Sequence, residues 1–313
     1  MGRGFWIGAT GAAAVLAAVA LCGPAGARPT LPAAGADGAA MALCENLRRD
    51  IDPGARIAAC DGLIIGGAQG ETLRRALIAR ANAYLERGGA LRAIDDFTAA
   101  IALKPDEAGP YADRALVREA LGQHRAAIAD ASHALALNPS LIPPYVTRAN
   151  ARQALGDQAG ALKDFDQALT VNPDLGGIYF GRAMLRGSLG QEPAAVADYG
   201  EAIRLLPNDP APLVNRAVIY MRWGRLDDAG KDLDQALKLD PKMATAMFDR
   251  ALLMDIKGQK DEALHMLDKA IKLQPDFAAA YCARARVRRT SGDDPGAEAD
   301  LTEATRRGGK SCA

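Results

Sequence analysis

The chain has 313 residues, enough for a substantial core, and its 38 basic and 38 acidic side chains leave no net charge. This balance gives no support for nucleic acid or an anionic membrane as partner, and aromatic residues at 5% are too few for a base-stacking platform. Alanine dominates the apolar residues, and Val, Ile and Thr form no alternating runs, so an all-α fold is expected.

The first 27 residues have the features of a signal peptide. Arg3 supplies a positive charge ahead of the apolar run 9–21, which is too short to span a bilayer comfortably. Residues 25–27 (AGA) match the small-residue pattern of a cleavage site, so the mature chain is predicted to begin at Arg28. This predicts an exported bacterial protein of the periplasm. The alternative is an uncleaved anchor, in which case this segment is the predicted contact with a membrane.

Two short regions follow the predicted signal peptide. Residues 28–41 are rich in Pro, Gly and Ala and are expected to form a flexible linker. Residues 42–73 are expected to hold an N-terminal helical hairpin and a connector, with the turn of the hairpin at Asp52-Pro53-Gly54.

Residues 74–307 contain seven copies of a 34-residue repeat, and residues 308–313 form a tail. Three kinds of residue recur in one register, which indicates a stacked array of helical hairpins. The prolines are Pro105, Pro139, Pro173, Pro207, Pro241 and Pro275. The glycines are Gly88, Gly122, Gly156, Gly190, Gly224, Gly258 and Gly292. The pair Arg-Ala recurs at 80–81, 114–115, 148–149, 182–183, 216–217, 250–251 and 284–285.

Each recurring residue has a mechanical role. Glycine provides the left-handed backbone conformation that ends the first helix of a repeat. Proline stops the second helix, because the residue before a proline is disfavoured in the helical region. Two further ladders of alanine, which begin at Ala93 and Ala100, lie seven residues apart on one face of the second helix and allow close packing.

The repeats resemble those of the tetratricopeptide-repeat family. The third copy shows Tyr145, Ala149, Ala161, Phe165 and Pro173 at the family's spacing, although alanine replaces the early glycine and arginine replaces the leucine before it. The resemblance covers residues 74–307. It implies an all-α, right-handed superhelical solenoid of seven helix–turn–helix repeats after the N-terminal hairpin. It also implies a concave face, lined by the first helices, that binds peptides or protein domains.

Aspartate recurs sixteen residues after each arginine of the ladder, at Asp96, Asp130, Asp164, Asp198, Asp232 and Asp300, and is replaced only by Met266. One interpretation is a charged stripe that binds a ligand. The other is an internal Arg–Asp pair within each hairpin, and this interpretation is favoured because regular charge pairs are usually structural.

Four cysteines remain after the predicted signal peptide, an even number that suggests disulfides in an oxidising compartment. Cys44 and Cys60 lie eight residues on either side of Asp52, so an antiparallel hairpin brings them together. Cys282 lies in the first helix of the last repeat, and the second helix returns the chain toward that end before Cys312. The sequence leaves open whether Cys282 and Cys312 pair.

The sequence shows no constellation for catalysis or for a metal. The three histidines, His124, His133 and His265, lie far apart and form no metal-binding motif with cysteine or glutamate. No catalytic residue, cofactor or metal ligand is therefore assigned, and the chain is not expected to be an enzyme.

By resemblance, the concave face can be listed residue by residue. It is mixed in the first three repeats, with Ile78, Asn82, Glu86, Ala112, Leu116, Glu119, Val146, Asn150 and Gln153. In repeats four to six it becomes apolar, and the candidate partner-binding residues are Phe180, Met184, Val214, Val218, Met221, Arg222, Phe248 and Leu252. The apolar residues either form an exposed groove for a peptide or belong to the core between repeats.

These observations predict a scaffold or adaptor that binds a protein or peptide on the concave face of the repeats, without cofactor or nucleic acid. The alternative is a noncatalytic cell-envelope factor that binds a carbohydrate polymer or supports a membrane enzyme. Aromatic side chains would favour the carbohydrate, and the first helices offer few beyond Phe180 and Phe248.

Overall fold

The structure is a computed structural model that describes residues 36–46, 50–308 and 312. In this part of the chain every regular element is an α-helix. The chain divides into two units, and each is described by itself. Unit 1 ends at Pro173 and contains α2 (Ala36–Glu45), α3 (Pro53–Ile65), α4 (Gly70–Glu86), α5 (Ala90–Leu103), α6 (Ala108–Ala120), α7 (His124–Leu137), α8 (Ile142–Ala154) and α9 (Gln158–Val171).

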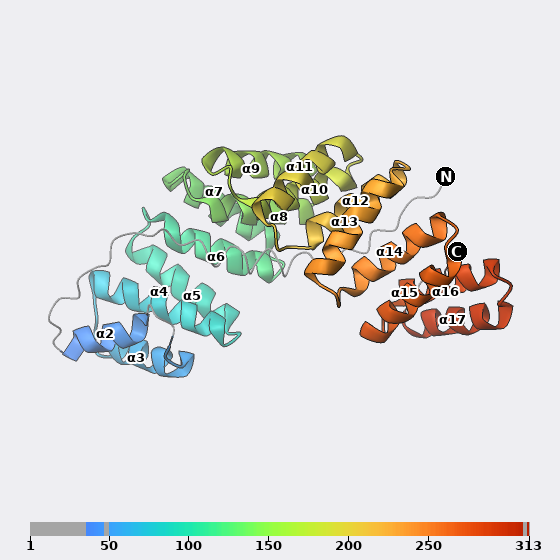
Figure 1. The fold of residues 1–313 in the computed structure, drawn as a ribbon. Helices are drawn as coiled ribbons and strands as arrows, with labels where there is room; N and C mark the ends of the chain where they lie inside the picture. The colour runs from blue at the N-terminus through green and yellow to red at the C-terminus, as the bar shows by residue number, and fades with distance from the viewer. Residues whose placement is uncertain (1–35, 47–49, 309–311, 313) are drawn as a thin grey trace. The chain divides into compact units, whose positions relative to one another are not determined.

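Unit 2 begins at Asp174 and contains the remaining helices. These are α10 (Gly176–Ser188), α11 (Glu192–Leu205), α12 (Ala211–Arg222), α13 (Leu226–Leu239), α14 (Ala244–Ile256), α15 (Lys260–Leu273), α16 (Ala278–Thr290) and α17 (Asp294–Arg306). Within each unit, consecutive helices form hairpins that pack against the next hairpin (Figure 1). The seven pairs from α4–α5 to α16–α17 follow the 34-residue repeat, which confirms the all-α repeat fold.

The recurring glycines end the first helices as the sequence predicts. All seven have positive φ angles, between 72° and 86°. A Cβ atom added at any of them would meet no other atom within 4 Å. Glycine is therefore required by the backbone conformation of the turn and not by a lack of space.

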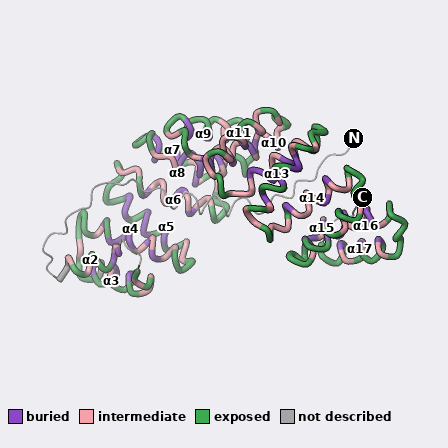
Figure 2. Tube along the Cα trace, viewed as in Figure 1, coloured by how far each residue is buried: buried purple, intermediate pink, exposed green. Residues whose placement is uncertain are grey.

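The recurring alanines form the contacts between helices. Ala93, Ala100 and their equivalents in the other six repeats are fully buried. Figure 2 shows buried residues on the sides of the helices that face other helices, while most turns are exposed. A larger side chain at these positions would push the hairpins apart, because interiors of this kind are close-packed.

The N-terminal region differs from the expectation. The flexible linker was expected to reach residue 41, but α2 begins at Ala36. Met41 is buried against Cys60 and Leu63, so packing on α3 stabilises a helix in a segment that looks like a linker by composition. The predicted signal peptide and residues 28–35 lie outside the described residues, as do most residues of the tail.

The turn of this hairpin also ends earlier than expected. Asp52 accepts a hydrogen bond from the Ala55 amide (3.1 Å), and Pro53 is the first residue of α3. Asp52 and Pro53 therefore begin the second helix, as an N-cap and a first-turn proline commonly do, and do not form the turn.

Candidate partner-binding face

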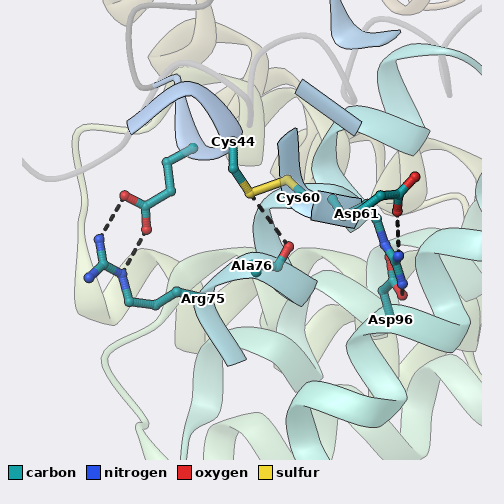
Figure 3. Close-up of a disulfide and its surroundings, with 8 residues drawn as sticks. Cys44, Cys60, Asp61, Arg75, Ala76 and Asp96 are labelled. Carbon is teal, nitrogen blue, oxygen red and sulfur yellow. Dashed lines mark hydrogen bonds and ion pairs between the residues drawn. A yellow bond between two sulfur atoms is a disulfide. The ribbon is translucent and has the colours of Figure 1, made fainter. Parts of the chain in front are cut away.

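The structure contains two disulfides, the predicted bridge between Cys44 and Cys60 and the bridge between Cys282 and Cys312 that the sequence left open. Cys44 and Cys60 join α2 to α3 with their Cα atoms 4.9 Å apart, and both are fully buried (Figure 3). The sulfur of Cys44 lies 3.9 Å from the carbonyl oxygen of Ala76, so the bridge also packs on α4. Cys282 and Cys312 join α16 to the tail with a Cα–Cα distance of 5.3 Å. The first bridge therefore closes the N-terminal hairpin, and the second ties the tail to the first helix of the last repeat.

The aspartate ladder is internal, as the favoured interpretation predicts. In six repeats the aspartate accepts hydrogen bonds from the arginine sixteen residues before it, and the aspartates are at most 5% exposed. The pairs are Arg80–Asp96, Arg114–Asp130, Arg148–Asp164, Arg182–Asp198, Arg216–Asp232 and Arg284–Asp300. These carboxylates are engaged inside the hairpins and offer no stripe to a ligand.

The same arginines also connect one repeat to the one before it. The Nη1 atom of Arg114 donates to Thr98, that of Arg148 to Ser132, and that of Arg284 to Asp268. Each acceptor lies sixteen residues before its arginine, on the second helix of the preceding hairpin. In the first repeat Arg80 contacts Asp61 of α3 in this way, and Figure 3 shows Asp61 near Asp96.

Two of the predicted partner-binding residues belong to the core. Phe180 is 8% exposed and packs with Tyr199, the ring centroids being 6.0 Å apart. Val214 is 6% exposed and belongs to a cluster with Leu213 and Leu233. The expectation that these two side chains line an exposed groove is wrong, because large residues of the second helices cover them.

The other five apolar residues are half-buried, and they are called the apolar strip from here on. They lie on the first helices of three successive repeats: Met184, Val218, Met221, Phe248 and Leu252. Four of them rest partly on core residues, and Phe248 packs with Phe277 at a centroid distance of 5.0 Å. Val218 and Leu252 occupy the same register on α12 and α14, which contact each other. The side chains of the apolar strip thus pack partly on the core and remain partly accessible to solvent.

The polar residue predicted beside the apolar strip is accessible. Arg222 is exposed and pairs with Glu192 at 3.0 Å. The second carboxylate oxygen of Glu192 accepts a hydrogen bond from the indole of Trp223 (2.5 Å). A partner that binds the guanidinium group of Arg222 must therefore compete with Glu192 for it.

The structure adds a residue that sequence analysis missed. Asp249 on α14 directly precedes Arg250 and lies between Phe248 and Leu252 of the apolar strip. Among the described residues its carboxylate has no hydrogen-bond or ion-pair partner, and burial raises its pKa to about 7. The sequence offers one sign that this acid is unusual. The equivalent position is uncharged in five other repeats, where it holds Ala79, Thr147, Gly181, Asn215 and Ala283.

Unit 1 has an acid in the same register. Asp113 on α6 is half-buried, and burial raises its pKa to about 6. Burial also raises the pKa of Glu119 on the same helix, opposed by the charge of His124. α6 therefore carries two acids in surroundings that disfavour the charged form, Glu119 of the predicted mixed face and Asp113, which was not predicted.

The described residues contain no group of three or more His, Cys, Asp or Glu side chains that could hold a metal ion. His133 packs on Tyr111 with ring centroids 4.2 Å apart. Within the same residues, no helix combines the length and the apolar character that crossing a membrane requires.

Comparisons with known proteins agree with the repeat fold. Family models of the tetratricopeptide repeat match residues 211–243 and 257–311. No curated protein matches the sequence. Among solved structures, the fold is similar to that of a tetratricopeptide repeat protein from Parabacteroides merdae, with 18% identity and a TM-score of 0.61 over 75% of this chain and 93% of that one.

Two further structures are similar. YrrB, described as a TPR protein with an unusual peptide-binding site, is 26% identical with a TM-score of 0.51, over 60% of this chain and 97% of that one. Pseudomonas aeruginosa pilF is 18% identical with a TM-score of 0.57, over 64% of this chain and 92% of that one.

Proposed function

The chain is a tetratricopeptide-repeat protein, and we propose that it is a noncatalytic adaptor of the bacterial envelope that binds a peptide or protein segment on the apolar strip. The fold in general serves protein–protein interaction. The observation that carries the proposal is the apolar strip itself, whose five large side chains on first helices remain only half-buried. Contiguous apolar surface on a protein commonly marks an interaction site.

A peptide suits this surface for three reasons. Val218 and Leu252 lie in one register on adjacent helices, so an extended or helical segment can contact both. The peptide-binding site named for YrrB belongs to that protein, and its similarity to this chain supports the same class of partner here. Methionine side chains such as Met184 and Met221 adapt to partners of different shape.

Export to an oxidising compartment is part of the proposal. Two disulfides form in the described structure, and such bonds persist outside the cytosol. The charge, apolar run and small-residue pattern of residues 1–27 support a signal peptide. N-terminal sequencing of the protein from an envelope fraction tests this part, and an intact Met1 in the cytoplasm would contradict it.

The binding face is tested by substitution. Val218→Glu and Leu252→Glu place charge on the apolar strip, whereas Leu273→Glu places it at an exposed leucine at the end of α15. Capture of envelope proteins by the strip variants should fall at least tenfold, about 1.4 kcal/mol, while the control captures normally. Circular dichroism must show that all variants fold. Folded strip variants that capture normally would place the partner elsewhere, and the mixed face of unit 1 would be tested next.

A further inference from the structure

Asp249 lies within an accessible stripe of α14. Thr245, Asp249, Leu252 and Ile256 follow one another at intervals of four, three and four residues, which places them on one side of the helix. Thr245 is exposed, and Ile256 is 56% exposed. Asp249 and Leu252 are half-buried between them. The carboxylate thus sits where the apolar strip meets solvent.

Three arginines on α14 and on the adjacent first helices pair with other acids. Arg250 on the same helix pairs with Asp234 of α13 at 3.0 Å. Arg286 on α16 pairs with Asp255 at 2.9 Å. On α12, Arg222 pairs with Glu192, as described above. No charged side chain of the described structure therefore balances Asp249.

The residues in the same register on the adjacent helices supply no charge either. Asn215 on α12 donates its amide to the Ala211 carbonyl (2.9 Å), and Ala283 on α16 is apolar and buried. A carboxylate with neither an ion pair nor a hydrogen-bond donor is costly to keep charged in such surroundings. Groups of this kind are often retained for binding, because the missing partner arrives with the ligand.

The same arrangement occurs in unit 1, and this observation is independent of the apolar strip. Asp113 lies 136 residues, or four repeats, before Asp249 in the same register. It also has no hydrogen-bond or ion-pair partner among the described residues. Two unpaired acids in one register, in an array whose fully buried aspartates are all paired with arginine, indicate a position used for contact rather than an isolated substitution.

We propose that Asp249 binds the positively charged side chain of a lysine or arginine in a peptide that lies on the apolar strip. The ammonium or guanidinium group supplies the missing ion pair and its hydrogen bonds. Leu252 and Ile256 contact the methylene stem of the same residue, as apolar surface does with long basic side chains. The partner is accordingly a peptide with a basic residue flanked by apolar ones. This inference rests on the proposed function.

The test selects ligands from a random library of peptides of about twelve residues displayed on phage. The full chain purified with its disulfides intact serves as bait, alongside Asp249→Asn and the control Asp261→Asn, which removes an exposed acid from α15. Wild type and Asp261→Asn should enrich peptides with lysine or arginine between apolar residues. Asp249→Asn should lose the basic preference, keep the apolar one, and bind synthetic copies of the basic peptides at least about tenfold more weakly.

The outcomes separate this inference from the function on which it rests. Apolar peptides without basic enrichment, or basic enrichment that survives in Asp249→Asn, would overturn the role of Asp249 and leave peptide binding in place. Failure of the wild type to select any peptide would overturn both. Because Asp249→Asn removes an unpaired charge, we expect it to fold at least as well as the wild type, and a thermal melt checks this.

Discussion

Asp232 on α13 accepts two hydrogen bonds of 2.8 Å from the guanidinium group of Arg216 on α12. The two helices form one repeat, and the aspartate is 5% exposed. The pair therefore joins the two helices of the hairpin in its interior. Its geometry is bidentate, which is the strongest arrangement for arginine and carboxylate.

Replacing this aspartate should destabilise unit 2. Asp232→Ala leaves the Arg216 guanidinium partly buried and without its main partner, so we expect a loss of about 3 kcal/mol in the free energy of unfolding. Asp228→Ala on the same helix breaks an exposed pair with Arg225 and should cost less than about 1 kcal/mol. Urea denaturation followed by circular dichroism measures both. Equal losses in the free energy of unfolding for the two variants would show that the buried pair stabilises the protein no more than the exposed one.

The repeat with the interrupted ladder permits the reverse experiment. Met266 stands where the other repeats have aspartate, and Arg250 pairs with Asp234 instead. Met266→Asp offers Arg250 the usual acceptor, whereas Met266→Asn has the same size without the charge. We expect the aspartate variant to be about 2 kcal/mol more stable than the asparagine variant at pH 7. The opposite order would mean that Arg250 cannot turn away from Asp234.

Removing the disulfides should weaken each unit separately. Cys44 and Cys60 are 16 residues apart, and loss of a loop of this size costs about 3 kcal/mol in the chain-entropy description. Cys282 and Cys312 are 30 residues apart, for which the same description gives about 3.6 kcal/mol. The double serine variants of each pair test these values by denaturation. A non-reducing peptide map with all four thiols free would contradict both bridges.

Stability should depend on pH through Asp249. Burial raises its pKa to about 7 from an ordinary value of 3.8, so the folded chain holds a proton that the unfolded chain has lost. The free energy of unfolding therefore falls as pH rises from about 4 to 7 and then levels off. Asp249→Asn should be more stable than the wild type at pH 8, with a difference that shrinks toward pH 4. A difference independent of pH would show that the carboxyl titrates normally.

The repeat fold could be predicted from sequence because its signals are local and recur in register. Gly88 and its equivalents fix a backbone conformation, and Ala93 and its equivalents fix a close contact, whatever lies elsewhere in the chain. The first disulfide could be predicted for the same reason, since Cys44 and Cys60 need only a short hairpin to meet. The start of α2 could not, because Ala36 is helical only through packing of the segment on α3.

The candidate binding face was harder to predict. Phe180 and Val218 both occupy the predicted strip, yet Phe180 is buried and Val218 is only half-buried. The difference in burial depends on large side chains of other helices, such as Tyr199, which packs on Phe180. The position of a residue in the repeat does not show which of these side chains will cover it. Asp249 was missed because an acid on a helix surface looks ordinary until the acids that engage its neighbouring arginines are known.

The arginines that connect successive hairpins also determine where cooperativity weakens. The Nη1 atom of Arg216 would require an acceptor sixteen residues earlier, but that residue is Gly200, which has no side chain. Unit 2 therefore lacks this hydrogen bond between α11 and α12, whereas Arg250 and Arg284 connect the two later junctions. Partial opening of unit 2 should begin at this junction, so the amide protons of α10 and α11 should exchange with solvent as one group, ahead of those in α14 and α15.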